Sequence, residues 1–446
     1  MTGKLSKVVI VGGGPAGMMA AWHLAGNHEV HLYEKEARLG RKFLVAGKGG
    51  LNITRHLDVV ALKASYEPSG FMDRALSAFD SESLRNWMLQ LGFSTFVGTS
   101  GKVFPAKDIT ALQILNKLID SLKERGVIIH NRHRLVRFDE FMNFTFEQEE
   151  TNPDVIDHLM AGRKGSFQTV TADYAVLALG GASWPQTGSD GKWVEVMKQN
   201  EVSTLPFRPS NCGVNIGWPG VVRESHAGKP LKNIKTAIGT LAARGAESVD
   251  QTTREWSAAS GNMTATGEAL ITEYGLEGTA IYPLVPEIRR QLLLGVIPQL
   301  TIDFKPQNTS EQLLEKLKES PSGHPSGAGK EGKSAMYRTK LSLNSAQLAV
   351  IKAFTYKEVF ADPVRFCRAV KQVVIPVHSL RPVEEAISVV GGVDLNELNS
   401  NYSLKKFPRI FIIGEMSDWD APTGGFLLQG CFSMGAYVAS AMDEIF

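Results

Sequence analysis

The residues with the clearest chemical meaning form a glycine-rich turn near the start of the chain. Gly12, Gly14 and Gly17 have the spacing G-x-G-x-x-G, with Pro15 and Ala16 between the last two. Gly12 permits a tight turn, Gly14 lets the backbone approach a pyrophosphate, and Gly17 lets a helix pack closely on a strand. The bare helix N-terminus offers N–H groups and a positive dipole end to phosphates. The spacing predicts a dinucleotide site, and its alternative is a glycine-rich turn of another α/β protein.

The residues that follow this turn favour FAD over NAD. Glu34 ends the next strand-like run, where a carboxylate accepts hydrogen bonds from the hydroxyls of the adenosine ribose. Basic residues then lead into a second glycine-rich segment, which an NAD dehydrogenase does not need at this place. We expect cofactor contacts from Lys35, Arg41, Lys42, Gly49, Gly50, Leu51 and Asn52.

The C-terminal part of the chain supports the same interpretation. Residues 410–415 (IFIIGE) are similar to a strand–Gly–Asp signature that holds the flavin ribityl chain, with Glu415 in place of the usual Asp. Gly424, Gly425 and Phe426 then open a long helix, whose N-terminal dipole would stabilise negative charge on a reduced flavin. A capped core helix after a hydrophobic strand is the alternative. Contacts are also expected from Val136, Ala178, Gly180, Gly181 and Gly414.

Five stretches together resemble one bacterial flavoprotein family. They are GRKFLVAGKGGLNITR, VLALGGASWPQTGSDG, GEALITEYGLEGTAI, AISVVGGVD and IFIIGEMSDWDAPTGGFLLQGCFSMGAY. The family is that of NAD(P)/FAD-dependent oxidoreductases, which includes aminoacetone-oxidase-like and dehydro-bile-acid-reductase-like proteins. The resemblance covers nearly the whole chain. It implies a glutathione-reductase-type FAD domain formed by both chain ends, with an inserted β-barrel-like domain that carries a small helical piece.

Two departures from the family pattern indicate a divergent subgroup. Relatives usually read Gly-Gly-Arg-Cys-Asn where this chain has residues 48–52 (KGGLN). After the C-terminal glycine pair they often have an aromatic residue and then Asn, whereas this chain has Phe426 and Leu427. The resemblance places these positions near the isoalloxazine ring, so it leaves the reaction and the substrate open.

Candidates for the reaction itself are few. His378 and Arg381 precede a glycine pair in a segment that the resemblance places close to the flavin. Arg381 would clamp an anionic substrate with two hydrogen bonds, or form a surface ion pair. His378 would shuttle a proton, or serve as a structural histidine. Cys431 is interpreted as a small buried filler rather than a redox partner.

The hydrophobic pattern of the sequence predicts an α/β fold for the cofactor domain and an α+β arrangement for the chain as a whole. Buried strands are expected at 7–11, 29–33, 174–179 and 409–413, and helices at 18–25, 81–91, 108–125, 311–318 and 426–442. Residues 39–55 are expected to form a loop, and residues 320–334 a mobile one. The expected domains are a Rossmann-like FAD-binding domain made of residues 1–200 and 371–446, and an inserted domain over 201–370.

The composition of the chain argues against several classes of binding partner. The 446 residues carry a net charge of +2 without basic patches, which argues against nucleic acid and anionic membranes. An apolar run long enough to span a bilayer is missing, and three distant cysteines favour a reducing cytoplasm. The histidines and acidic residues do not have metal-ligand spacing. The oligomeric state is not predicted.

The function predicted from these observations is that of an FAD-dependent oxidoreductase. Hydride would pass between flavin N5 and an unidentified small-molecule substrate. A second G-x-G-x-x-G after a strand is missing, so NAD(P)H, if it reduces the flavin, would dock transiently. The alternative is an FAD-binding redox sensor or interaction protein with little turnover.

Overall fold

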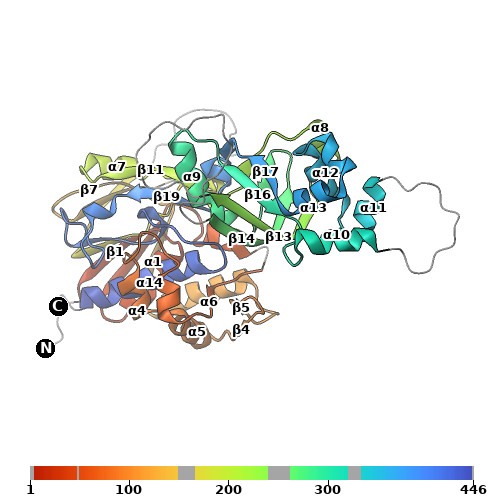
Figure 1. Cartoon of the computed structure of the whole chain (residues 1–446). Helices are drawn as coiled ribbons and strands as arrows, with labels where there is room; N and C mark the ends of the chain where they lie inside the picture. Colours follow the sequence, from red (N-terminus) through yellow and green to blue (C-terminus); the bar gives the residue numbers. More distant parts are fainter. Residues whose placement is uncertain (1–4, 48–49, 149–165, 240–261, 320–332, 444–446) are drawn as a thin grey trace, which may run out of the picture. The chain divides into compact units, whose positions relative to one another are not determined.

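The computed structural model describes residues 5–47, 50–148, 166–239, 262–319 and 333–443 (Figure 1). The chain divides into two compact units, one made of 1–209 with 383–446 and the other of 210–382. The expected boundaries, after residues 200 and 370, differ from these divisions. The second boundary lies later because β17 (Val373–Pro376) pairs with β16 (Gln299–Asp303) of the second unit. The first lies later because most of β11 (Thr204–Ser210), which pairs with β19 (Ser388–Val393), belongs to the first unit.

The first unit is built on a five-stranded parallel sheet with the order β20-β10-β1-β2-β6. Its strands are β1 (Lys7–Val11), β2 (Glu29–Glu34), β6 (Ile128–Asn131), β10 (Tyr174–Leu177) and β20 (Ile410–Ile412). The central strand β1 buries Val8, Val9 and Ile10 completely, as a parallel strand covered on both faces should. Because all five strands are parallel, the turns that follow β1, β10 and β20 share one edge of the sheet. This edge positions the glycine motifs.

Two helices from opposite ends of the chain pack together against this sheet. They are α1 (Pro15–Leu24) and α14 (Phe426–Asp443), which lie side by side in Figure 1. Met19 and Ala20 of α1 are fully buried. A Cβ atom at Gly435 of α14 would lie 2.5 Å from the carbonyl oxygen of Ala16, so the two backbones approach at a position that only glycine allows.

The loop expected over residues 39–55 is partly wrong. Residues 41–46 (RKFLVA) form the short helix α2 (Arg41–Ala46), and β3 (Thr54–Arg55) follows. The helix begins after Gly40, whose φ of 68° is the left-handed conformation that glycine adopts readily. The segment 41–46 contains neither glycine nor proline, so it can continue as a helix.

Smaller elements complete the first unit. The helices are α3 (Val59–Lys63), α4 (Asp73–Ala78), α5 (Ser81–Gln90), α6 (Ala111–Glu124) and α7 (Val194–Gln199). β4 (Thr95–Val97) and β5 (Lys102–Pro105) form a three-stranded sheet with β3, and β7 (His133–Phe138), β8 (Asn143–Gln148) and β9 (Ser166–Thr171) form another. The 3-10 helices are η2 (Pro185–Thr187), η5 (Val383–Glu385), η6 (Leu395–Glu397) and η7 (Gly414–Met416).

The second unit contains a seven-stranded sheet with the order β17-β16-β13-β14-β15-β12-β18. Its remaining strands are β12 (Val214–Asn215), β13 (Pro230–Gly239), β14 (Asn262–Ile271), β15 (Gly275–Glu277) and β18 (Ser379–Leu380). The two edge strands, β17 and β18, are consecutive in the chain and only Val377 and His378 separate them. A sheet whose edges are joined by two residues must curl, so the prediction of a barrel-like insertion agrees with this topology.

Helices cover part of this curled sheet. α10 (Ser310–Lys318), α11 (Lys333–Lys340), α12 (Ser345–Ala353) and α13 (Pro363–Lys371) form a helical piece whose buried residues belong to the same core as the strands (Figure 1). α8 (Gly220–His226), α9 (Val285–Leu293), η3 (Tyr282–Leu284) and η4 (Lys357–Ala361) are the other helical elements. The loop expected over 320–334 lies outside the described residues, apart from Lys333 and Ser334, which begin α11.

Candidate functional site

A cavity of about 310 Å³ lies in the first unit, where the turns after β1, β10 and β20 meet the end of β2. Most of the residues predicted from the sequence to bind cofactor line it. They are Gly12, Gly14, Pro15, Ala16, Glu34, Lys35, Arg41, Lys42, Val136, Ala178, Gly180, Gly414 and Glu415. The parallel sheet therefore brings together residues that lie up to about four hundred positions apart in the chain.

The turn after β1 has the geometry that the glycine spacing predicts. Gly12 has a φ of 111°, and a Cβ atom there would lie 2.2 Å from the carbonyl oxygen of Ala178. A Cβ atom at Gly17 would lie 2.0 Å from the carbonyl oxygen of Gly12. Around Gly14, by contrast, the space is open to 4 Å, and α1 begins there without a side-chain cap. An open position beside an uncapped helix N-terminus has the geometry that suits a phosphate group.

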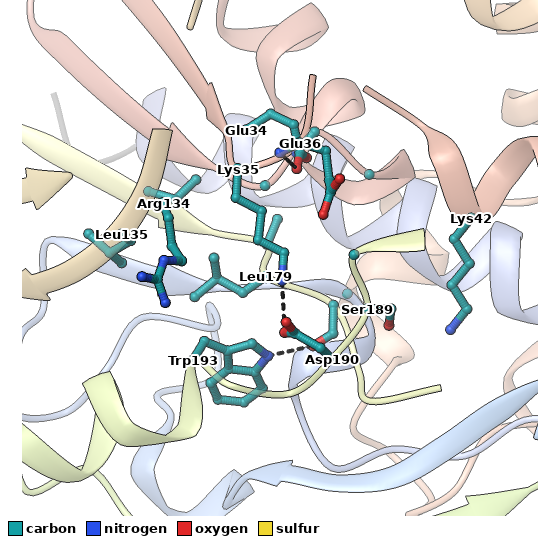
Figure 2. A pocket seen from close by; sticks show the side chains of 18 of the residues that line it. Glu34, Lys35, Glu36, Lys42, Arg134, Leu135, Leu179, Ser189, Asp190 and Trp193 are labelled. Carbon is teal, nitrogen blue, oxygen red and sulfur yellow. Dashed lines mark hydrogen bonds and ion pairs between the residues drawn. The ribbon is translucent and has the colours of Figure 1, made fainter. Parts of the chain in front are cut away.

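Glu34 is fixed at the end of β2 by two backbone groups. The N–H of Gly13 donates to Oε2 at 2.7 Å, and the N–H of Glu36 donates to Oε1 at 2.9 Å (Figure 2). Burial raises the pKa of Glu34, and these two hydrogen bonds oppose that effect. Each carboxylate oxygen has a further lone pair, so the side chain can accept hydroxyl hydrogen bonds from a ribose in the cavity.

The cations beside Glu34 are held by acidic partners. Lys35 Nζ lies 2.7 Å from Asp190 Oδ1, as Figure 2 shows. Burial alone would raise the pKa of Asp190, but the hydrogen bond and the charge of Lys35 lower it below its usual value. Arg41 forms an ion pair with Glu36 and donates to the carbonyl oxygen of Gln186 at 2.8 Å.

The other end of the cavity contains an ion pair between the two ends of the chain. Lys42 Nζ lies 2.6 Å from Glu415 Oε2 and donates to Ser183 Oγ at 2.7 Å. A Cβ atom at Gly181 would lie 3.0 Å from Glu415 Cδ, so the bare glycine makes room for the longer acidic side chain. Burial, together with the Glu415 carboxylate, raises the pKa of Cys431 to about 12. This thiol is therefore neutral at pH 7, as expected for a filler.

Several lining residues were not predicted individually. Ser189 Oγ is buried and lacks a hydrogen-bond partner among the described residues. Trp193 Nε1 donates to the carbonyl oxygen of Gly180 at 2.8 Å and fixes the turn after β10. Ser189 and Asp190 fall within the stretch VLALGGASWPQTGSDG, so the family resemblance contained their signal. Arg134, Leu135 and Leu179 also line the cavity (Figure 2).

These observations fit a flavin dinucleotide. The open position at Gly14 and the uncapped N-terminus of α1 suit a pyrophosphate, and Glu34 suits an adenosine ribose. The unpartnered Ser189 Oγ is a buried polar group that a ligand in the cavity can satisfy. Glu415 and Lys42 supply a hydrogen-bond acceptor and a cation at the opposite end of the cavity.

Other predicted cofactor residues lie outside the cavity lining. Gly17 packs against the backbone of Gly12, and Gly181 packs against Glu415. The others lie near β3 and are Gly50, Leu51, Asn52, Gly424, Gly425 and Phe426. A Cβ atom at Gly425 would lie 2.7 Å from the backbone of Thr54, and Phe426 is buried. Gly49 lies outside the described residues.

His378 and Arg381 both belong to the second unit. The Arg381 guanidinium carbon lies 4.0 Å from the centroid of the Tyr274 ring, and Nη1 donates to Asn215 Oδ1 at 3.3 Å. Tyr274 in turn donates its hydroxyl hydrogen to Glu277 Oε2 at 2.5 Å. His378 is exposed in the link between β17 and β18. Stacking and hydrogen bonding thus hold the Arg381 guanidinium in place, and together they restrict it more than a surface ion pair would.

The described ranges show neither a metal-binding cluster nor a membrane-spanning helix. Groups of three or more His, Cys, Asp or Glu side chains that could hold a metal ion are not found there. Over the same ranges, the helices are all too short or too polar to cross a bilayer.

The parallel sheet, the glycine turn and the acidic residues at or just after the ends of two strands define an FAD-binding protein of the oxidoreductase class with a Rossmann-type fold. A profile described as the HI0933-like protein Rossmann domain matches residues 6–441, and the chain belongs to this family.

The chain is also similar to individual proteins. It is 22% identical to a 3-dehydro-bile acid delta(4,6)-reductase of Clostridium scindens, over 99% of this chain and 100% of the relative. Among solved structures, it is similar to a 3-ketosteroid delta1-dehydrogenase of Sterolibacterium denitrificans (TM-score 0.47, 12% identity, 99% of this chain and 100% of that chain). A 3-ketosteroid-delta4-(5alpha)-dehydrogenase of Rhodococcus jostii RHA1 has a TM-score of 0.43 and 13% identity, over 99% and 98% of the two chains.

Proposed function

We propose that this protein catalyses hydride transfer between flavin N5 of bound FAD and a small-molecule substrate that contains a carbonyl group. The observation that carries the proposal is one cavity in the first unit to which both ends of the chain contribute. It contains the turn at Gly14, the carboxylate of Glu34 and the ion pair of Lys42 with Glu415. The substrate class rests on the similarity to a reductase of a 3-dehydro-bile acid, which extends over the whole of both chains.

The protein groups have separate tasks in this proposal. Bound FAD supplies the redox chemistry by taking or giving hydride at N5. The N-terminus of α1 binds the pyrophosphate, and Glu34 accepts hydrogen bonds from the adenosine ribose. Glu415 accepts a ribityl hydroxyl hydrogen bond, and Lys42 holds Glu415 in position. We place Gly424, Gly425 and Phe426 with the flavin, as the N-terminus of α14 favours negative charge on a reduced ring.

Arg381 and His378 are the proposed residues on the substrate side. Stacking on Tyr274 and the hydrogen bond to Asn215 limit the rotamers of Arg381, so less side-chain entropy is lost when the guanidinium binds a carbonyl or carboxylate oxygen. His378 is exposed and can exchange a proton with a substrate or with water. These roles are proposals for both residues.

NAD(P)H is the proposed electron donor, and it would dock transiently. Within the described residues, the strands form one five-stranded parallel sheet of the kind that binds a dinucleotide, and its cavity is assigned here to FAD. A stable second dinucleotide domain is therefore not part of the proposal.

The first test is the cofactor and its reduction. The purified protein should be yellow, release FAD on denaturation and lose its flavin absorption band when mixed anaerobically with NADH or NADPH. Reoxidation should then follow when 3-oxo steroids or bile acids are added whose ring double bonds are conjugated with the carbonyl group, because these are the bonds that a delta(4,6)-reductase reduces. A colourless protein that takes up no added FAD would refute the proposal, and a flavin that no donor reduces would favour the redox sensor.

Two variants test the substrate side. Arg381→Lys should raise KM about tenfold, because a lysine cannot reproduce the planar stacked cation. His378→Gln should lower kcat, because the amide cannot exchange a proton with the substrate. Arg365→Lys changes an exposed arginine of the same unit and serves as the control. Unchanged kinetics in both variants would remove these two residues from the proposal.

A further inference from the structure

A second cavity, with a volume of about 360 Å³, lies entirely within the second unit. It is formed by three chain segments: a bulge in β13, the residues after β16 and the start of α12. Its lining contains two lysines and five side-chain amides, with neither Asp nor Glu among them. From these residues we propose that the cavity binds the phosphoryl oxyanion of a small ligand, either inorganic phosphate or a phosphate monoester.

Lys305 is the central cation of this cavity. Its Nζ donates to the carbonyl oxygen of Ser342 at 2.8 Å, which uses one of the three donors of an ammonium group. The nearby carboxylate of Asp303 is occupied elsewhere, because its Oδ2 lies 2.6 Å from Lys371 Nζ and its Oδ1 accepts from the backbone N–H of Lys305. Burial, with the charge of Lys316 added, lowers the pKa of Lys305. The negative charge of an anion in the cavity would oppose the lowering of this pKa by burial and by Lys316.

Gln347 contributes a donor whose direction is determined by its neighbours. This residue is 5% exposed, and its Oε1 accepts from the N–H of Asn344 at 3.0 Å in the capping box of α12. Since the backbone N–H identifies the accepting atom as oxygen, the other end of the carboxamide must be the NH₂ group. Within the described residues, this NH₂ group has no acceptor, and the side chain lines the cavity.

Asn308 and Lys232 extend the donor set. Asn308 Oδ1 accepts from Lys316 Nζ at 3.4 Å, which leaves the NH₂ end of its carboxamide as a donor. Lys232 lies at the point where the pairing of β13 with β14 shifts, and bulges of this kind often re-aim side chains at binding sites. N–H donors therefore approach from all three segments. A tetrahedral phosphate has oxygens that point in several directions and can accept from all of these donors. A carboxylate has only two oxygens, and both lie in one plane.

Calorimetric titration of the holoprotein in a phosphate-free buffer tests this site. Inorganic phosphate and glycerol 3-phosphate are titrated separately, with glycerol as the neutral control. Saturable binding of at least one phosphate is expected, with glycerol silent. Monoester binding at least about tenfold tighter than that of inorganic phosphate identifies an organic phosphate as the ligand, and similar affinities identify the free anion. Failure of both to bind at millimolar concentration overturns the proposal.

Two variants link the binding to the cavity. Gln347→Glu keeps the capping box, which accepts Glu as well as Gln at this position, but it replaces the donor with a carboxylate oxygen. Lys305→Gln removes the charge and keeps a donor for Ser342. Each should weaken phosphate binding at least about tenfold, whereas Lys318→Gln, at an exposed position of α10, should not. Unfolding curves show whether the variants fold. Phosphate binding that persists in both folded variants would place the anion elsewhere and refute the site. The titrations measure phosphate binding alone, so their outcome does not depend on the proposed flavin chemistry.

Discussion

Lys42 Nζ lies 2.6 Å from Glu415 Oε2, and this ion pair joins α2, near the start of the chain, to η7, near its end, at the cofactor cavity. Both side chains are mostly buried, at 27% and 17% exposure. Ser183 accepts a second hydrogen bond from the same ammonium group. The pair therefore orders two walls of the cavity with respect to each other.

Glu415→Gln should weaken FAD binding. The substitution leaves Lys42 partly buried without its counter-charge and removes an ionised acceptor for the ribityl chain. We expect the Kd for FAD to rise about tenfold, or ~1.4 kcal/mol, in a titration of apoprotein followed by flavin fluorescence. Glu201→Gln removes an exposed ion pair with Lys406 in the same unit and is the control. An unchanged Kd would exclude Glu415 from cofactor binding.

Two glycines of the same turn should respond differently to alanine. In Gly17→Ala the new Cβ would lie 2.0 Å from the Gly12 carbonyl oxygen, so the free energy of unfolding should fall by about 1–3 kcal/mol or more. In Gly14→Ala the new Cβ enters open space at a φ of −82°, which alanine tolerates. The stability should change by less than about 0.5 kcal/mol, while FAD binding weakens because the methyl group occupies the pyrophosphate position. Chemical denaturation and FAD titration separate these effects. Equal losses of stability would contradict the assigned geometry.

Ser189→Ala should separate cofactor binding from folding in another way. Ser189 Oγ is buried and unpartnered in the described structure, so its removal costs no protein hydrogen bond. We expect apoprotein stability to stay the same or rise slightly, and FAD affinity to fall several-fold because a ligand hydrogen bond is lost. Ser183→Ala provides the comparison, since its Oγ already accepts from Lys42. Unaltered FAD affinity in Ser189→Ala would place this hydroxyl outside the cofactor site.

Stability should depend on His23 between pH 6.5 and 4. Burial, aided by the charge of Arg125, lowers the pKa of His23 to about 4. Over this range the unfolded state binds up to one more proton than the folded state. The free energy of unfolding therefore falls as the pH falls, by up to about 1.4 kcal/mol per pH unit from this residue. Urea unfolding of His23→Gln at pH 7, 5.5 and 4.5 should show a smaller pH dependence, whereas exposed His56→Gln should behave as wild type. An identical slope in His23→Gln would contradict the assignment.

Local patterns in the sequence predict much of the cofactor domain. The spacing of Gly12, Gly14 and Gly17 between a β-branched run and an apolar helix is a local signal, and the structure has the turn that it predicts. Glu34 and Glu415 were predictable because Glu34 ends one apolar strand and Glu415 closely follows another, and parallel strands bring their ends to one edge. The resemblance to a family supplied the insertion and its place in the chain.

Contacts between distant segments could not be predicted in this way. Asp190 lies 155 residues after its partner Lys35, and no spacing rule relates them. The placement of Arg381 over Tyr274 depends on how β15 and β18 flank β12. The short helix α2 was missed because the glycines around it dominate the composition of its segment. The second cavity depends on three segments that have no shared motif.

The packing of α1 against α14 also affects how the protein is made. During synthesis, α1 leaves the ribosome about four hundred residues before α14, the helix that covers Met19 and Ala20. Until then, the face of α1 that α14 covers has no neighbour, and the sheet lacks its edge strand β20. Contacts between such distant segments form late and leave hydrophobic surface open to aggregation. The nascent protein should therefore need chaperone protection until α14 has been synthesised, and it should acquire its flavin only afterwards.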